Sequence, residues 1–424
     1  MLSYRKLAMR VLGRPLHTEG IDSPRPASQR AAAFILTAAM LTTLAAPAFA
    51  DIWHIENGDI TISAGESGNN VTQNNNTTYG DTNTIITNQN KDTASSHTVT
   101  IEAKDKDDKV EVTLKDVNID TSSRNKAAVS VTGEGDTNIK LDGDNALKSD
   151  IYRSGIYGSG SGSLTISGGE NDSLTAQGGS GANGISSSGS LTISGGTVTA
   201  NGDDGGRGIS SNGGVTISGG STVTANGGSG TISGGDGIWS GGGVTISGGS
   251  TVTANGGNGG SLVGGDGIRS GGGLTVSDGT VTAKGGNGDS KDGYGGDGIR
   301  SGGVVTISGN TVNAAGGYGG KVGGYGICSF DRVAISGGTV EAAGGNGSTG
   351  GGSGIYSSVI DLSGSLELTA KAGSPNGKAL SQKGSELVLD TIKDKLGPGA
   401  KVTATDADGK VIDQVSTPRP VEPE

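Results

Sequence analysis

The sequence predicts an all-β fold, a three-sided parallel β-helix (β-solenoid) with right-handed coils. The first observation is a repeat of a Gly-Ile pair, a Val-Thr-Ile-Ser run and a Thr-Val-Thr-Ala run, in this order, at intervals of 24 to 31 residues. The second is composition: glycine supplies 85 of 424 residues and aromatics only 3%, too few large side chains for a compact globule. We therefore expect about eight regular coils, irregular N-terminal coils and a C-terminal β cap.

Residues 1–50 are predicted to be a secretory signal peptide. Six basic residues lead into the apolar stretch 31–46, and Ala48-Phe49-Ala50 has the small-residue pattern of a cleavage site. An apolar stretch of about 16 residues is short for a membrane-spanning helix. We therefore expect a secreted or cell-surface protein with no membrane insertion after cleavage.

Cleavage after Ala50 would leave a strongly acidic chain. The full sequence has a net charge of −11, and residues 1–50 carry six basic and two acidic side chains, so the mature chain carries −15. This charge repels phosphate backbones, and we expect no nucleic-acid partner. Cys328 is the single cysteine and cannot form an internal disulfide, so stability has to come from the stacking of coils.

Residues 51–150 are expected to form irregular first coils and an N-terminal cap. Alternating apolar and polar residues, as in 59–63 and 110–114, predict strands with one buried face. The Asn- and Thr-rich segment 69–90 is interpreted as a loop. A cap is needed because an open solenoid end exposes unpaired backbone groups.

Residues 151–384 form the regular glycine-rich array, in which alternate residues of each run point inward. A serine column is expected to form hydrogen bonds along itself at a tight corner. The predicted inward columns are Ile156, Ile185, Ile209, Ile238, Ile268, Ile299, Ile327 and Ile355; then Ile166, Ile193, Ile217, Ile246, Val276, Ile307 and Ile335; then Leu174, Val198, Val223, Val252, Val281, Val312, Val340 and Leu368; and the serines Ser187, Ser211, Ser240, Ser270, Ser301, Ser329 and Ser357.

Residues 385–415 are expected to close the array. Strand-like runs at 387–389, 401–404 and 411–412 would form the C-terminal β cap. The Pro-rich tail 416–424 is not expected to join a sheet, because proline cannot donate to a strand ladder.

One outward column places Trp239, Arg269 and Arg300 on successive coils. An aromatic face beside guanidinium groups is a candidate platform for a sugar ring or an acidic sugar. The alternative is that Arg269 only covers Trp239 through a cation–π contact.

A second outward column aligns Asp236, Asp266 and Asp297, with Arg207 at one end. Carboxylates at coil spacing repel one another. Either the side chains splay into solvent, or a cation such as Ca²⁺ bridges them. The three aspartates are therefore the candidate metal ligands, and Ca²⁺ is the one candidate cofactor.

The loops that precede each Gly-Ile pair vary in length and leave from one corner. Two of them carry the candidate ligand-binding residues Tyr294, Tyr318 and Tyr325. Insertions gathered on one edge are often the binding edge of a solenoid. The alternative is that glycine-rich loops simply tolerate insertions.

Catalytic motifs are not evident, and we expect no enzyme. His17, His54 and His97 lie outside the regular array, and no nucleophile elbow, zinc spacing or P-loop is present. Hydrolysis of a polysaccharide by paired aspartates would need two carboxyl groups in unlike environments. A polysaccharide lyase or hydrolase is therefore kept only as a further alternative.

The strings Leu191–Gly196 and Thr197–Ala200, and the approach Asp142–Leu147, carry a family resemblance. The repeats resemble secreted bacterial parallel β-helix surface proteins and are similar to the bacterial carbohydrate-binding β-helix (pectate-lyase-like) family. The resemblance implies extracellular polysaccharide binding, sometimes with calcium. We expect a non-enzymatic adhesin or structural spacer, or alternatively a carbohydrate-binding module, that meets an extracellular polysaccharide or a glycan on a host or neighbouring surface.

Overall fold

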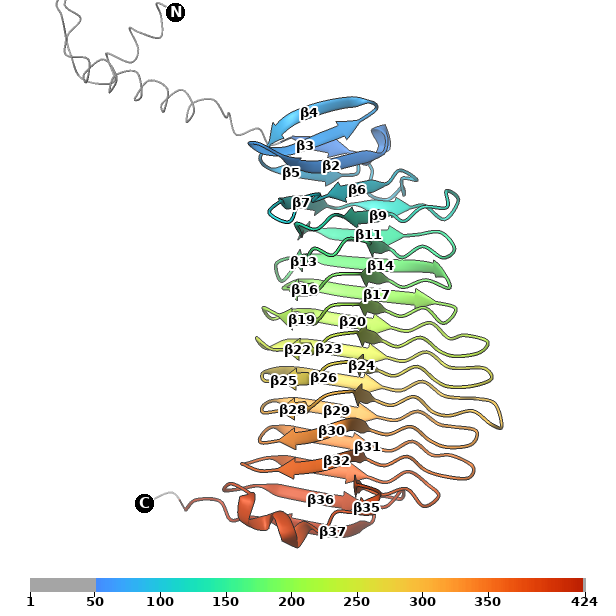
Figure 1. Cartoon of the computed structure of the whole chain (residues 1–424), viewed down its shortest axis with the longest axis vertical. Helices are drawn as coiled ribbons and strands as arrows, with labels where there is room; N and C mark the ends of the chain where they lie inside the picture. Colours follow the sequence, from blue (N-terminus) through green and yellow to red (C-terminus); the bar gives the residue numbers. More distant parts are fainter. Residues whose placement is uncertain (1–50, 422–424) are drawn as a thin grey trace, which may run out of the picture. The chain divides into compact units, whose positions relative to one another are not determined.

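The computed structural model describes residues 51–421 and shows a parallel β-solenoid of about 11 turns (Figure 1). The predicted all-β fold is confirmed, with half of the chain in strands. The number of turns exceeds the eight regular coils expected, because strands before residue 150 and after residue 385 pair in parallel with the array. The predicted signal peptide, residues 1–50, lies outside the described residues. No helix within residues 51–421 is long and apolar enough to cross a membrane.

Each coil contributes a short strand to each of three faces. The first face carries the Gly-Ile pairs and consists of β2 (Ile60–Gly65), β6 (Val99–Glu102), β9 (Val129–Thr132), β12 (Ile156–Gly158), β15 (Ile185–Ser187), β18 (Ile209–Ser211), β21 (Ile238–Ser240), β24 (Ile268–Ser270), β27 (Ile299–Ser301), the first parts of β30 (Ile327–Ile335) and β32 (Ile355–Leu362), and β34 (Leu380–Gln382).

The second face consists of β1 (Ile52–His54), β5 (Thr84–Thr87), β7 (Lys109–Lys115), β10 (Asp136–Asp142), β13 (Leu164–Ser167), β16 (Leu191–Ser194), β19 (Val215–Ser218), β22 (Val244–Ile246), β25 (Leu274–Val276), β28 (Val305–Ile307) and the later parts of β30 and β32. The third face is a separate sheet of β8 (Asn118–Asp120), β11 (Asp144–Lys148), β14 (Ser173–Ser180), β17 (Thr197–Asp203), β20 (Thr222–Asn226), β23 (Ser250–Asn255), β26 (Gly279–Lys284), β29 (Thr311–Ala315), β31 (Thr339–Ala343), β33 (Glu367–Lys371) and β36 (Lys401–Thr405).

The three predicted apolar columns are confirmed as the core. Ile238 pairs with Ile209 and Ile268, and Val252 pairs with Val223 and Val281 in the same register. These side chains are 0–1% exposed. β-branched residues suit these positions because they pack well on a pleated, buried surface.

The serine column is buried as predicted, but its hydrogen bonds run elsewhere. The hydroxyl of Ser240 donates to the carbonyl of Gly213 at 2.9 Å, and Ser270 donates to Gly242 at 3.0 Å. The serines from Ser211 to Ser329 thus bond to the glycine corner of the preceding coil and not to the next serine. The prediction of a self-bonded column is wrong, because a carbonyl oxygen of the corner lies within hydrogen-bond distance of each of these hydroxyl groups.

The N-terminal end is closed by an antiparallel hairpin, β3 (Gly68–Gln73) and β4 (Asn76–Asp81), added to β2 after the 3₁₀ turn η1 (Ile55–Asn57). The interpretation of 69–90 as a loop is therefore wrong. Asn74 and Asn75 form the hairpin turn with φ of 54° and 62°, a conformation that asparagine adopts more readily than most residues.

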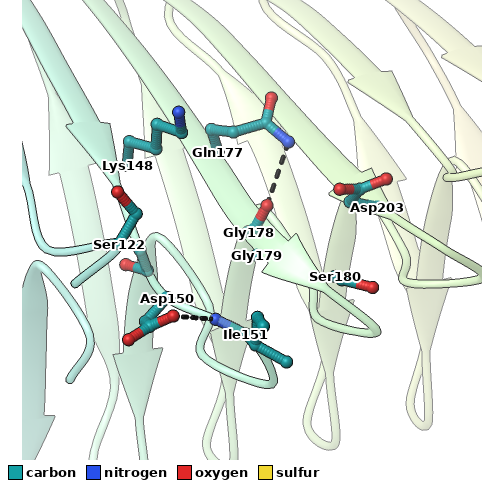
Figure 2. A pocket seen from close by; sticks show the side chains of 10 residues that line it. Ser122, Lys148, Asp150, Ile151, Gln177, Gly178, Gly179, Ser180 and Asp203 are labelled. Carbon is teal, nitrogen blue, oxygen red and sulfur yellow. Dashed lines mark hydrogen bonds between the residues drawn. The ribbon is translucent and has the colours of Figure 1, made fainter. Parts of the chain in front are cut away.

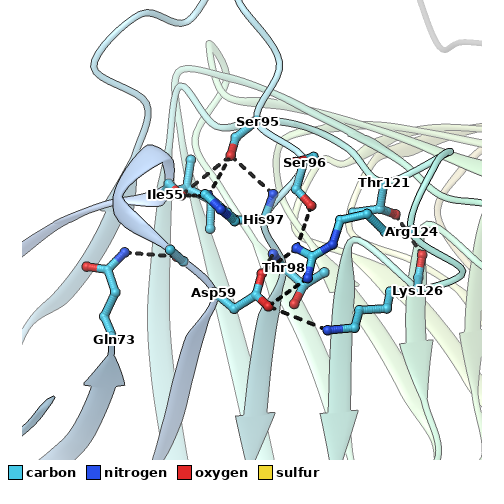
Figure 3. A network of polar contacts seen from close by, with 11 residues as sticks. Ile55, Asp59, Gln73, Ser95, Ser96, His97, Thr98, Thr121, Arg124 and Lys126 are labelled. Carbon is cyan, nitrogen blue, oxygen red and sulfur yellow. Dashed lines mark hydrogen bonds and ion pairs between the residues drawn. The ribbon is translucent and has the colours of Figure 1, made fainter. Parts of the chain in front are cut away.

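A polar cluster fastens this cap to the following coils (Figure 3). Asp59 accepts two hydrogen bonds from the guanidinium of Arg124, at 2.7 and 3.0 Å, and one from the backbone N–H of Thr98 at 2.8 Å. Burial opposes ionisation of Asp59, but these bonds and the charge of Arg124 hold its pKa well below the usual range. The carboxylate therefore joins segments that are about 40 and 65 residues apart in the chain.

The C-terminal end is closed by β37 (Val411–Ser416), which pairs antiparallel with β36, by β35 (Ser385–Glu386) and by the 3₁₀ helix η2 (Leu389–Lys395). The strands predicted at 401–404 and 411–412 are confirmed. The strand predicted at 387–389 is wrong, because Leu389 opens η2 and is buried there with Ile392. The segment after Ser416 stays attached to the cap for two residues, since Thr417 N–H bonds to Ala400 O and Gly399 N–H to Pro418 O.

Candidate functional site

The glycine-rich loops stack into a layer that extends from one corner of the solenoid (Figure 1). This glycine layer consists of loops 227–236, 256–266, 285–297, 316–325 and 344–353, which lead from third-face strands to the next Gly-Ile strand. Successive loops form parallel bridges through Gly230, Gly259, Gly288, Gly319 and Gly347.

Outgoing and returning limbs of the glycine layer are joined by a continuous chain of backbone hydrogen bonds. The N–H of Gly257 donates to Gly235 O, that of Gly265 to Gly257 O, and that of Gly286 to Gly265 O, each at 2.8 Å. A Cβ on Gly286 would lie 2.0 Å from the carbonyl oxygen of Gly257. Glycine is therefore required for this close backbone packing, whereas the alternative that these loops tolerate insertions stays a prediction.

A groove of about 460 Å³ lies where the glycine layer meets the first face. One wall is made by glycines of the layer, among them Gly234, Gly235 and Gly264. The charged residues of its lining come from successive coils: Arg207, Asp236, Asp266, Arg269 and Arg300. The groove thus brings two of the three predicted aspartates together with both predicted arginines.

Arg207, and not Arg269, covers Trp239. The Arg207 guanidinium lies 4.3 Å from the centroid of the Trp239 ring, and its Nε is 3.5 Å from Oδ2 of Asp236. The predicted contact of Arg269 with Trp239 is therefore wrong. The carboxylate of Asp236 lies one coil further along the solenoid, and a long side chain from the preceding coil reaches it across the indole face.

Arg269 lies between Trp239 and Arg300 as their direct register partner. Arg300 has a partner on each side: Nη1 is 3.6 Å from Oδ2 of Asp297, and the guanidinium is 5.1 Å from the Phe330 ring. Arg269 is exposed and forms no hydrogen bond and no ion pair within 4 Å with any residue of 51–421. Its guanidinium is the most available donor in the groove.

The aspartate column is built into the backbone and does not splay into solvent. Asp236, Asp266 and Asp297 are 6%, 6% and 4% exposed. Oδ1 of each accepts the backbone N–H at the same position of the next coil, at 2.8, 2.7 and 2.7 Å. Asn183 makes the same bond to the N–H of Arg207 at 2.8 Å. The expectation of splayed, solvated carboxylates is therefore wrong, because each of the three carboxylates is turned toward the backbone N–H of the next coil.

Burial raises the pKa of all three carboxyls. Asp266 lies between the other two and its pKa is raised well above the usual value, first by burial and then by the charges of Asp297 and Asp236. The pKa of Asp297 rises to about 6 through burial, although the N–H of Tyr325 and the charge of Arg300 oppose the rise. No group of three His, Cys, Asp or Glu side chains in the described part of the chain is arranged to hold a metal ion. The geometry gives no support to a calcium site at this column.

Replacing Asp266 with asparagine is expected to stabilise the fold at neutral pH by about 1–3 kcal/mol. Asparagine keeps the acceptor oxygen, as Asn183 shows, and removes the buried charge. Because the folded pKa lies above the unfolded value of about 3.9, the folded state holds the proton more tightly, and the wild-type free energy of unfolding falls as pH rises from about 4 through the folded pKa.

Thermal midpoints measured from pH 4 to 8 check this expectation. Asp266→Asn should show a higher midpoint at pH 7 and a weaker decline from pH 4 to 7 than the wild type. Asp289→Asn is the matched control, since Asp289 is an exposed aspartate of the neighbouring loop. A lower midpoint for Asp266→Asn at pH 7 would show that the charge itself stabilises the corner.

The three tyrosines do not form one site. Tyr325 continues the aspartate column and stacks on Tyr356, with ring centroids 4.8 Å apart. Tyr294 and Tyr318 are each 45% exposed in the glycine layer, where Tyr294 lies 5.6 Å from Nζ of Lys321. Tyr325 therefore belongs with the Arg300 side of the first face, whereas the other two belong to the layer.

A second groove, of about 540 Å³, lies nearer the N-terminal end of the solenoid (Figure 2). Its polar groups are already bound locally. Both carboxylate oxygens of Asp150 accept backbone N–H groups, Lys148 lies 3.8 Å from Asp120, and Gln177 donates to Gly178 O. The charged and amide side chains named here all have local partners and are not free to bind a ligand together. The arginine-lined groove is therefore the stronger candidate site.

Sequence reasoning missed two features of this region. Arg207 was placed only at the end of the aspartate column, although an arginine one coil before Trp239 could have signalled the stacking. The amides of Asn201, Asn226 and Asn255 form a ladder on the third face, with Nδ2–Oδ1 distances of 2.8 and 2.9 Å. Their recurrence after the Thr-Val-Thr-Ala run was the available signal.

Comparison of the chain with protein-family models, with curated proteins and with solved structures gives no match.

Proposed function

We propose that this chain is a non-enzymatic, extracellular β-solenoid that acts as an adhesin or spacer and presents one binding edge. The observation that carries the proposal is a difference between the constant and the variable positions of the repeat. Constant positions fill the core or bond one coil to the next, as Ile238 and Ser240 do. Of the positions that change from coil to coil, those with charged side chains, Arg207, Arg269 and Arg300, line the groove beside the glycine layer. A rod with one variable, charged edge suits attachment better than catalysis.

Carbohydrate binding at this groove is the second candidate. It is favoured by the indole of Trp239 beside the guanidinium groups of Arg207 and Arg269, a combination that suits sugar rings bearing acidic groups. A hydrolase or lyase is less supported. Each buried aspartate already uses one oxygen to hold the next coil, so all three repeat the same structural task.

Binding of the full chain to a glycan array, with and without Ca²⁺, tests these candidates. If the groove binds glycans, Trp239→Ala should weaken binding by about tenfold or more, because it removes the aromatic surface and the support of Arg207. Tyr157→Ala is the control, since Tyr157 is an exposed aromatic residue of the same outward column, three coils before Trp239.

The outcomes separate the alternatives. Glycan binding that Trp239→Ala reduces and Tyr157→Ala does not would support the carbohydrate-binding candidate. An intact rod that binds no glycan would reject the carbohydrate-binding candidate and support the role of a spacer. Cleavage of an acidic polysaccharide by the wild type would overturn the non-enzymatic proposal.

A further inference from the structure

Three arginines gather in the groove, beside the buried carboxyls of Asp236 and Asp266, although the chain as a whole is acidic. Three of the seven arginines in residues 51–424, Arg207, Arg269 and Arg300, line it. They come from coils that are close together in the stack, so the clustering is a property of the fold and not of local sequence. An acidic surface elsewhere would repel a polyanion and confine its binding to this place.

Arg269 and Arg300 bring two like charges together in the groove, and the carboxylates of Asp236 and Asp297 offset the charge of Arg269 only from beyond 4 Å. Arg269 and Arg300 are direct register partners in a parallel ladder, where strands are ~4.8 Å apart. Like charges directly opposite each other on a sheet are destabilising. Asp297 partly offsets Arg300, but no carboxylate lies within 4 Å of Arg269 among the described residues. An anion beside Arg269 would remove this repulsion.

Most guanidinium donors in the groove have no close acceptor. Each guanidinium offers five N–H donors, about fifteen in all. Those with partners reach them at long distances: 3.5 Å from Arg207 to Asp236, 3.4 Å from Arg207 to Ser210, and 3.6 Å from Arg300 to Asp297. Planar groups with unused parallel donors bind carboxylate and sulfate oxygens in pairs.

We propose that the groove binds the acidic groups of a carboxylated or sulfated polysaccharide, with Arg269 as the central contact and Arg207 and Arg300 on either side. This inference rests on the carbohydrate-binding form of the proposed function. A polymer is favoured over a single small anion, because the three arginines come from several coils and a polymer can lie along successive coils. The glycines that line the groove have no side chains and let the polymer approach the backbone closely.

Binding of three polymers to the full chain tests the inference. Dextran sulfate and polygalacturonate carry the predicted acidic groups, and neutral dextran is the matched uncharged probe. We expect binding of both acidic polymers and none of dextran. Arg269→Gln should weaken binding of the acidic polymers about ten- to hundredfold. Arg332→Gln, at an exposed arginine outside the groove that pairs with Asp361 at 3.6 Å, should change it less than about twofold.

Thermal unfolding gives a second readout that a merely structural role would not produce. Without ligand, Arg269→Gln should leave the midpoint unchanged or raise it slightly, because the repulsion with Arg300 is removed. Dextran sulfate should raise the midpoint of the wild type and of Arg332→Gln but not that of Arg269→Gln.

Contrary outcomes are distinguishable. Unchanged affinity of Arg269→Gln for the acidic polymers would overturn the inference, and so would a lower midpoint without ligand. Equal binding of neutral dextran would overturn it while sparing the carbohydrate-binding candidate. Binding of inorganic sulfate without binding of either acidic polymer would reject a polysaccharide ligand. The absence of binding to any of these probes would overturn the inference and leave the spacer proposal standing.

Discussion

Val252→Asp is expected to unfold the solenoid locally around β23. The Val252 side chain is 0% exposed and lies between Val223 and Val281 in an unbroken apolar column. A carboxylate there would have neither water nor a cation, and an uncompensated buried charge costs about 3–5 kcal/mol or more. Because each coil contacts mainly its neighbours, we expect the damage to be concentrated in the adjacent coils.

Hydrogen exchange and limited proteolysis measure this local damage. Amides of β20, β23 and β26 should lose protection, and new cleavage sites should appear in the same coils. Thr251→Asp is the control, since Thr251 is the exposed neighbour on the outer side of the same strand. It should behave like the wild type. Wild-type protection and proteolysis of Val252→Asp would contradict the inward placement of this column.

The core could be predicted because two simple periodicities determine it. Alternation along Ile238-Trp239-Ser240 assigns the inner and outer side chains, and the recurrence of the three runs assigns the vertical neighbours. Neither inference depends on the conformation of a side chain or on the position of its terminal atoms. Strand pairing in the structure follows these assignments at every one of the predicted apolar positions from Ile185 to Ile327.

The site was harder to predict, because it depends on where long side chains end and how loops pack. Register alone placed Arg269 beside Trp239, whereas the carboxylate of Asp236 draws Arg207 onto that ring instead. The burial of the aspartates depends on the glycine layer, which covers that corner. Glycine has no apolar pattern from which such packing could be inferred, so the layer was interpreted as loops.

Gly286→Ala is expected to disrupt the glycine layer, although it adds a single methyl group. The new Cβ would lie 2.0 Å from Gly257 O and 2.5 Å from its carbon, both backbone atoms that cannot rotate away. Gly286 also donates to Gly265 O and accepts from Gly296 N–H, each at 2.8 Å. A shift of the backbone would weaken both bonds, and together with the overpacking we expect a cost of at least about 3 kcal/mol.

Gly350→Ala is the matched control for this substitution. Gly350 lies in the same layer, pairs with Val322, and a Cβ there would meet only the Val322 side chain at 3.6 Å. In hydrogen-exchange measurements Gly286→Ala should deprotect the amides of loops 256–266 and 285–297, and Gly350→Ala should not. If Gly286→Ala keeps wild-type protection there, the close backbone packing is wrong. If it loses protection and acidic-polymer binding falls with it, the layer also supports the wall of the groove, because Gly264 and Gly265 belong to both.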